Sequence, residues 1–347
     1  MTGGVVLGRP VSTRARRSAV TALKVAVSTA LLAYLVRKGH LGAVERAVGG
    51  ASPKWLVCGL ALGTLGAAVT VWQWWGVLNA LGLRRSYWRC ARLELAGDVF
   101  DAALPSSIGG DLLRAVSVAQ QRNERETGAA SVVLRRLCNF PGTVLLMSTG
   151  VAVTWAGGHA NKAWPAVLGA LALGLVLVVV TLSPLAGWLA CRPWLRGRPW
   201  RPLAHVLEVV GGFRLRRAAL RTAALRGCLF WCCAVASQWC YMRGVGVDRV
   251  TPAYAAVVVT VAAMVTMLPV ALGGYGLREG TFSALLVPAG IASVAQGVAV
   301  GACLTAQTAL FGLLGLPSYL TLRGGARARG RTRPAALVAA PANAEAA

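Results

Sequence analysis

Two stretches of this sequence are related: LPSSIGGDLLR, from Leu104 to Arg114, and LPVALGGYGLR, from Leu268 to Arg278. Without a gap, both fit L-P-x-x-x-G-G-x-x-L-R, with six identities in eleven positions. The shared residues interrupt helices, because proline cannot donate a backbone hydrogen bond and paired glycines adopt backbone angles that other residues resist. Each copy therefore predicts a helix that stops and a helix that restarts after the glycines.

Both predicted breaks lie inside or beside apolar sequence of membrane character. Irregular backbone at membrane depth is tolerated only where it is buried in protein or lines a wet cavity. Paired helix interruptions in the two halves of a membrane protein point to a transport site. The predicted substrate-binding residues are therefore those of the two breaks and the aspartates before the first: Asp98, Asp101, Pro105, Gly109, Gly110, Asp111, Arg114, Pro269, Gly273, Gly274, Gly276, Arg278 and Glu279.

The composition is that of a polytopic, all-α membrane protein. Of 347 residues, 56% are hydrophobic and 14% are charged, whereas soluble proteins are about a quarter charged. Several windows exceed the roughly 18 to 20 apolar residues that span a bilayer. The longest polar interval, about 183–222, is far shorter than a soluble domain of about 100 residues. We therefore expect no separate catalytic domain and no enzymatic activity from this chain alone.

The formal net charge of +25 does not indicate nucleic-acid binding. The arginines are scattered among short loops, whereas a nucleic-acid binder gathers them on one face of a soluble module. The positive-inside rule explains this charge, with attraction to anionic headgroups as a second effect. The nine cysteines and three histidines form no metal-ligand pattern, and there is no P-loop, so neither a metal nor a cofactor is predicted.

Hydropathy predicts about eight membrane-spanning helices. Their approximate ranges are 18–36, 55–78, 129–155, 164–182, 227–242, 251–268, 281–296 and 297–322. The arginine-rich loops place their side of the membrane in the cytoplasm, and with it both termini. The predicted transmembrane domain is thus 18–322, with halves 18–182 and 223–322 joined by the basic loop 183–222. A basic arm, 1–17, precedes it and a disordered tail, 323–347, follows.

The first break is predicted to be a re-entrant hairpin that enters from the cytoplasm. Basic residues flank it on both sides, Arg92 before it and Arg122 after it, which disfavours a full crossing. The region holds four of the chain's eleven acidic residues: Glu94, Asp98, Asp101 and Asp111. By this span count both motifs approach from the cytoplasmic side, as in a parallel repeat; one span more or fewer would make the repeat inverted.

At these residues the sequence resembles a known family, the transmembrane, flippase-like region of bacterial lysylphosphatidylglycerol synthases. The signature P-x-x-x-G-G-D-x-x-R is matched by Pro105, Gly109, Gly110, Asp111 and Arg114. The signature P-x-x-x-G-G-x-G-x-R-E is matched by Pro269, Gly273, Gly274, Gly276, Arg278 and Glu279. One departure is Arg135 before Arg136, where the family tends to carry an acidic residue. The resemblance therefore supports no charge pair there.

The resemblance implies a multi-pass protein of a bacterial plasma membrane that moves or positions a lipid with a charged headgroup. Its expected partners are anionic or polyprenyl-linked lipids. The alternative is a non-catalytic subunit that presents a lipid to a separate soluble glycosyl- or aminoacyl-transferase. An enzyme embedded in the membrane ranks third, since only the acidic cluster favours it. The sequence gives no indication of the oligomeric state.

The charged residues of the two breaks have a ligand-binding and a structural interpretation. An ionisable side chain at membrane depth costs about 2.5 to 3.5 kcal/mol, so it usually pairs or lines a pathway. Arg278 and free helix N–H groups suit a lipid phosphate, and the carboxylates suit a headgroup amine or an arginine. Structurally, Asp111 is placed to be an N-cap, Asp98 and Asp101 to lie on a solvated loop, and Arg278 with Glu279 to lie at the water interface or in a structural ion pair.

Overall fold

The computed structural model describes residues 29, 41–103, 108–121, 124–156, 167–169, 171–176, 208–209, 211–212, 216–266 and 276–331, the last nine by their backbone alone. All regular structure in these ranges is helical. The elements are α2 (Leu41–Gly49), α3 (Pro53–Ala80), α4 (Tyr87–Ala103), α5 (Ile108–Val118), α6 (Arg125–Ala156), α10 (Arg217–Gly244), α11 (Pro252–Thr266), α12 (Leu277–Leu286) and α13 (Val294–Arg331). The predicted all-α class is thus confirmed for this part of the chain.

Four of these helices are long and apolar enough to cross a membrane. They are α3, α6, α10 and residues Val294–Leu322 of α13, and they match the predicted spans 55–78, 129–155, 227–242 and 297–322. Helix α11 matches the span 251–268, but its 15 residues are fewer than the roughly 20 that cross a bilayer. The span 18–36 and most of the span 164–182 lie outside the described residues.

Two predictions near the carboxyl end are wrong. The predicted span 281–296 is not one helix, because α12 ends at Leu286 after 10 residues, a length of about 15 Å. A turn with Gly290 at φ 67° follows, and Pro288 lacks the N–H that a longer helix would need. The tail predicted to be disordered from residue 323 instead continues α13 to Arg331. Arginine and alanine are good helix formers, and an existing helix propagates at low cost.

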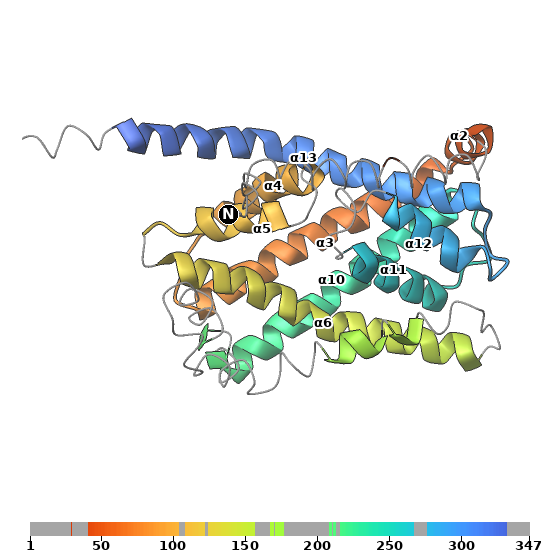
Figure 1. The fold of residues 1–347 in the computed structure, drawn as a ribbon, viewed down its shortest axis with the longest axis horizontal. Helices are drawn as coiled ribbons and strands as arrows, with labels where there is room; N and C mark the ends of the chain where they lie inside the picture. Colours follow the sequence, from red (N-terminus) through yellow and green to blue (C-terminus); the bar gives the residue numbers. More distant parts are fainter. Residues whose placement is uncertain are drawn as a thin grey trace, which may run out of the picture.

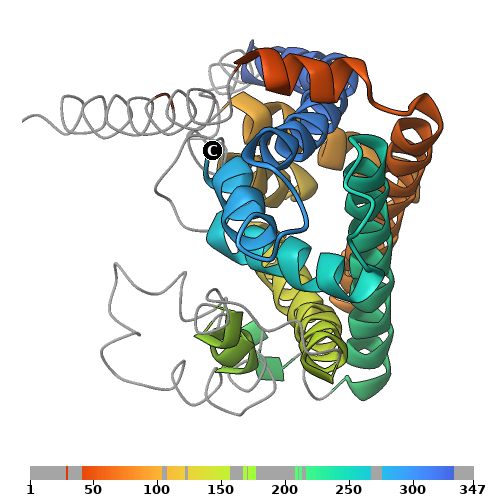
Figure 2. The ribbon, with the colours of Figure 1, turned by 90° about the vertical axis from the view of Figure 1, so that its right-hand side faces the viewer.

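The long helices pack side by side around a centre that α11 and α12 fill at one end (Figures 1 and 2). Helix α3 lies along α10, which also packs against α6 and α11. Helix α13 runs along the edge of the bundle and packs against both α4 and α12. The α4–α5 pair fills the space between α13, α3 and α6. This arrangement surrounds the first motif with apolar helices.

Two glycines let α6 and α10 approach at backbone distance. A Cβ at Gly142 would lie 2.8 Å from Cys228 Cα, and a Cβ at Gly227 would lie 2.5 Å from the Cys138 carbonyl oxygen. Neither neighbour is the movable end of a side chain. Small residues at such contacts are typical of membrane helices, whose association depends on close packing.

We expect Gly142→Ala to destabilise the protein, because the added methyl group forces α6 away from α10. Overpacking of this kind costs about 1 to 3 kcal/mol. The matched control is Gly49→Ala in α2, where an added Cβ meets nothing within 4 Å. Thermal unfolding of both purified variants in detergent tests the difference. An equal unfolding temperature for Gly142→Ala and the wild type would contradict this packing.

Candidate functional site

The start of the first motif, 104–107 with Pro105, lies outside the described residues. Helix α4 ends before it at Ala103, and α5 begins after it at Ile108. The second helix begins before the glycines, contrary to the prediction, and Gly109 and Gly110 lie in its first turn. The two helices pack against each other.

One of these glycines permits a close contact with a carboxylate. A Cβ at Gly110 would overlap the carboxylate of Asp101, whose carbon would lie 2.6 Å away. On the facing helix, a Cβ at Gly97 would lie 2.5 Å from the Arg114 guanidinium. Gly110 therefore leaves space for the Asp101 carboxylate beside α5 and does not interrupt that helix.

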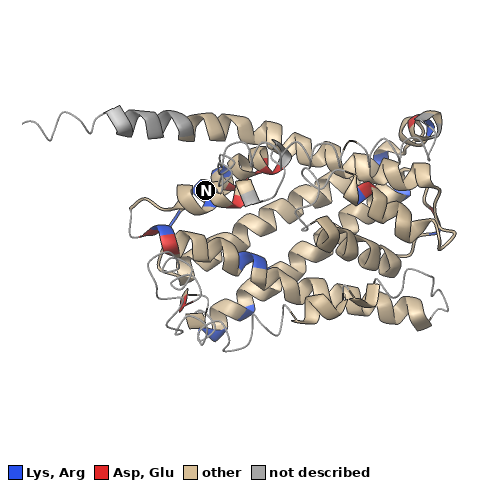
Figure 3. Cartoon of the chain, viewed as in Figure 1, with Lys and Arg blue, Asp and Glu red and all other residues tan. Residues whose placement is uncertain are grey.

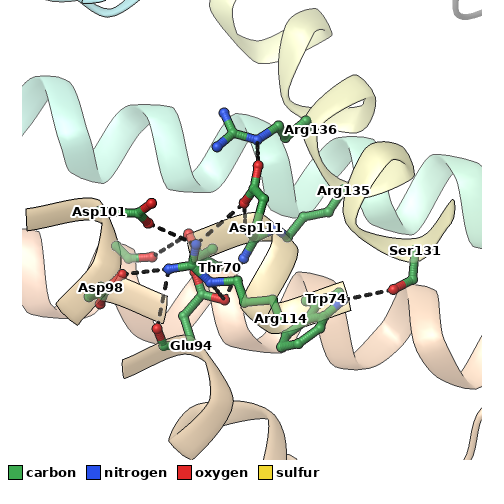
Figure 4. A network of polar contacts seen from close by, with 11 residues as sticks. Thr70, Trp74, Glu94, Asp98, Asp101, Asp111, Arg114, Ser131, Arg135 and Arg136 are labelled. Atoms are coloured by element: carbon green, nitrogen blue, oxygen red, sulfur yellow. Dashed lines mark hydrogen bonds and ion pairs between the residues drawn. The ribbon is translucent and has the colours of Figure 1, made fainter. Parts of the chain in front are cut away.

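Arg114 is the centre of a buried group of charges (Figure 4). Its side chain is 3% exposed and forms ion pairs with Asp98 at 2.6 Å, Asp101 at 2.8 Å and Glu94 at 3.2 Å. It also pairs with Asp111, three residues earlier on α5, at 3.3 Å. The structure thus brings together Asp98, Asp101, Asp111 and Arg114, four of the predicted site residues, around one guanidinium.

Two arginines of α6 extend this group. Arg135 donates to Glu94 at 2.6 Å and lies 3.6 Å from Asp111, while Arg136 donates from its Nε to Asp111. The buried ring of Trp74 lies under Arg135, with 5.6 Å between the guanidinium carbon and the ring centroid. Charge pairs do exist at the position where the resemblance supported none. They join α6 to α4 and α5.

The structural interpretations of the first-motif aspartates are wrong. Asp111 is the fourth residue of α5 and pairs with arginines, so it is not an N-cap. Asp98 and Asp101 lie on α4 with side chains 22% exposed, not on a solvated loop. Sequence analysis also left Glu94 and both α6 arginines out of the site. The spacing of 94, 98 and 101, one face of a helix, and two charges inside an apolar span were signals for them.

Four carboxyl groups face three guanidinium groups in this cluster, a formal excess of one negative charge when all are ionised. We call these residues the charge cluster: Glu94, Asp98, Asp101, Asp111, Arg114, Arg135 and Arg136. Asp101 Oδ1 is buried and accepts no hydrogen bond from the part of the chain that the structure describes. Such an orphaned buried acceptor is costly.

Six of the seven residues of the charge cluster, all but Asp111, form one wall of a cavity of about 390 Å³. The other walls come from α3, α10 and α13, and their described lining residues are uncharged. They include Gly66, Ala67, Phe230, Ala234, Gln238, Leu304, Gln307 and Phe311. Asn139 also lines the cavity, and its Oδ1 is a second buried acceptor without a donor among the described residues. The cavity therefore has a charged wall opposite apolar ones.

The cavity lies halfway along the long apolar helices. On α3 its lining residues are Gly63 to Thr70, and on α13 they are Leu304 to Phe311. Each lies within four residues of the midpoint of its candidate span, about 6 Å along the axis at 1.5 Å per residue. Figure 3 shows that these two helices carry almost no charged residues along this part of their length. The cluster is thus far from the polar ends of both helices.

The described part of the second motif lies away from this cavity. Gly276 is the N-cap of α12 and has φ 81°, a left-handed angle that favours glycine. The Glu279 carboxylate accepts the Gly276 N–H at 2.7 Å and the Thr305 hydroxyl at 3.3 Å, so it holds the helix start against α13. No residue of α12, including Arg278, lines the cavity. Pro269, Gly273 and Gly274 lie outside the described residues.

The fold and the site define a helical membrane protein with a charged cavity between its apolar helices. A family model described as the lysylphosphatidylglycerol synthase TM region matches residues 21–317. The chain belongs to this family, as the two signatures predicted. A comparison with curated proteins found no match.

We expect Arg114→Gln to destabilise the protein strongly, because it leaves four buried carboxylates with one guanidinium fewer. Removing one partner of a buried ion pair costs about 3 to 5 kcal/mol. The control is Arg84→Gln, which removes an exposed arginine outside the cluster and should change stability by no more than about 0.5 kcal/mol. Unfolding in a titration of denaturing detergent measures both. Equal stabilities of the two variants would show that the cluster does not hold the helices together.

Proposed function

We propose that this chain binds the charged headgroup of a membrane lipid in the cavity between α3, α4, α6, α10 and α13, and moves that lipid between leaflets. The observation that carries the proposal is the charge cluster on the wall of a cavity halfway along the apolar helices. Charged side chains at bilayer depth are expensive and usually line a pathway. A cluster that served packing alone would need no open space beside it.

The chemistry of the cavity favours a headgroup with a cationic or hydrogen-bond-donating group. The carboxylates of Glu94, Asp98 and Asp101 line the cavity, and carboxylate oxygens accept hydrogen bonds from donors. An amine or hydroxyl group of a phospholipid or of a polyprenyl-linked lipid supplies such donors. The facing apolar wall, with Phe230 and Phe311, suits the glycerol or acyl region beside the headgroup.

The proposal includes a location and a topology. The α4–α5 pair is a re-entrant segment that enters the membrane from the cytoplasmic side, and the protein resides in a bacterial plasma membrane with both termini in the cytoplasm. The dense arginines before α4 and α10 support this orientation under the positive-inside rule. Arg136, whose side chain is 36% exposed, connects the cluster to the surface of the protein.

Filling the cavity should stop transport without unfolding the protein. Ala67→Phe places a ring in the cavity, whereas Ala61→Phe, on the same helix, adds the same ring to an exposed position. In vesicles that contain acyl-labelled phosphatidylethanolamine or phosphatidylglycerol, wild-type protein should exchange the amine-bearing lipid rapidly between leaflets. Ala67→Phe should slow this exchange at least about tenfold, equivalent to about 1.4 kcal/mol, and Ala61→Phe by less than about twofold.

Equal exchange by Ala67→Phe and the wild type would contradict a route through this cavity. An absence of exchange with every lipid, combined with binding that Ala67→Phe abolishes, would instead favour the alternative in which this chain presents a lipid to a separate transferase. Copurification with a soluble enzyme would then be the next observation to seek.

A further inference from the structure

A second cavity, of about 580 Å³, lies between the start of α4, the end of α5 and the end of the apolar part of α13. We call it the arginine pocket. Its polar lining residues are Ser86, Arg89, Arg92, Ser117, Ser318 and Thr321, and none of the lining residues that the structure describes is a carboxylate. We propose that the arginine pocket binds the headgroup phosphate of an anionic phospholipid. This site is separate from the cavity of the proposed function and does not depend on transport.

The charge of the arginine pocket suits a phosphate. Arg92 is exposed and makes no hydrogen bond or ion pair with the described residues. Arg89 donates to the Ser117 carbonyl at 3.5 Å, which holds its guanidinium at the pocket wall. The pocket also lies at the amino terminus of α4, where the Ser86 hydroxyl accepts the Arg89 N–H at 3.3 Å. A helix amino terminus adds positive potential to that of the arginines.

The position and the floor of the pocket favour a lipid over a soluble anion. The candidate span of α13 ends at Leu322, which lines the pocket, so the arginines lie at the level where the apolar surface stops. Leu93 and Val116 form an apolar part of the wall below them. A phosphate bound by arginines above an apolar wall matches the arrangement of an anionic lipid at the membrane surface.

Helix α4 separates the two cavities, which differ in their charged lining. Arg89, Arg92 and Leu93 face the arginine pocket, and the next residue, Glu94, faces the charge cluster. The arginine pocket has only positive charges among its described lining residues and therefore selects anions, whereas three carboxylates and three arginines line the cavity of the charge cluster.

Two matched double variants test the arginine pocket. Arg89→Gln with Arg92→Gln removes two positive charges from it, and Arg217→Gln with Arg221→Gln removes two exposed positive charges from α10, outside it. Native mass spectrometry of detergent-purified protein measures the binding of a short-chain phosphatidylglycerol. The pocket variant should lose at least about tenfold in affinity, since each charge-assisted hydrogen bond is strong. The α10 variant should retain its affinity.

The single variant Arg92→Gln, at an exposed position, controls for loss of the fold and should weaken binding in the same direction. Competition with glycerol phosphate distinguishes the two sources of phosphate. Failure of millimolar glycerol phosphate to displace the lipid supports a lipid site, and full displacement would overturn the lipid in favour of a soluble phosphate ester. Equal losses in the two double variants, or no loss in either, would overturn the site itself.

Discussion

The burial of the Arg114 guanidinium is the constraint on which the arrangement of the first motif depends. A guanidinium that is 3% exposed among apolar helices requires carboxylates within ion-pair distance. Glu94, Asp98 and Asp101 on α4 supply them, and this fixes α5 against α4. From α6, Arg135 then pairs with Glu94 of α4, and Arg136 pairs with Asp111 of α5. Three helices are thus joined through one group of charges.

The same constraint explains the small residues around the cluster. Gly97 and Gly110 leave room for Arg114 and Asp101 respectively, because a Cβ at either position would overlap the charged group. Gly315 lets α13 approach α4 at backbone distance, so α13 closes the other side of the cavity. The signature glycine Gly110 therefore serves side-chain packing, whereas Gly276 is needed for its backbone angle.

The sequence predicted much of the fold, because membrane spans depend on length and hydropathy. It also predicted the first motif as a charged site, since three aspartates and one arginine in an apolar chain require partners. It did not predict which residues form ion pairs with these charges. Arg135 lies on a helix that begins after the motif, and its pairing with Glu94 depends on how α6 packs on α4 and α5. Residues 268–275 of the second motif lie outside the described residues, and Glu279 caps its own helix.

The central claim is that the charge cluster lies at bilayer depth, behind the lipid-facing side of α5. Leu112 is 63% exposed on α5. Crosslinking of a photoreactive benzophenone side chain at this position to lipid acyl chains, in vesicles, measures the depth of α5 most directly. The reference is the same group at Val57, which is 66% exposed on the membrane helix α3. If the cluster lies at bilayer depth, both positions should form adducts with lipid acyl chains. Acyl adducts from Val57 but none from Leu112 would contradict it, because α5 and its charges would then lie outside the hydrocarbon region.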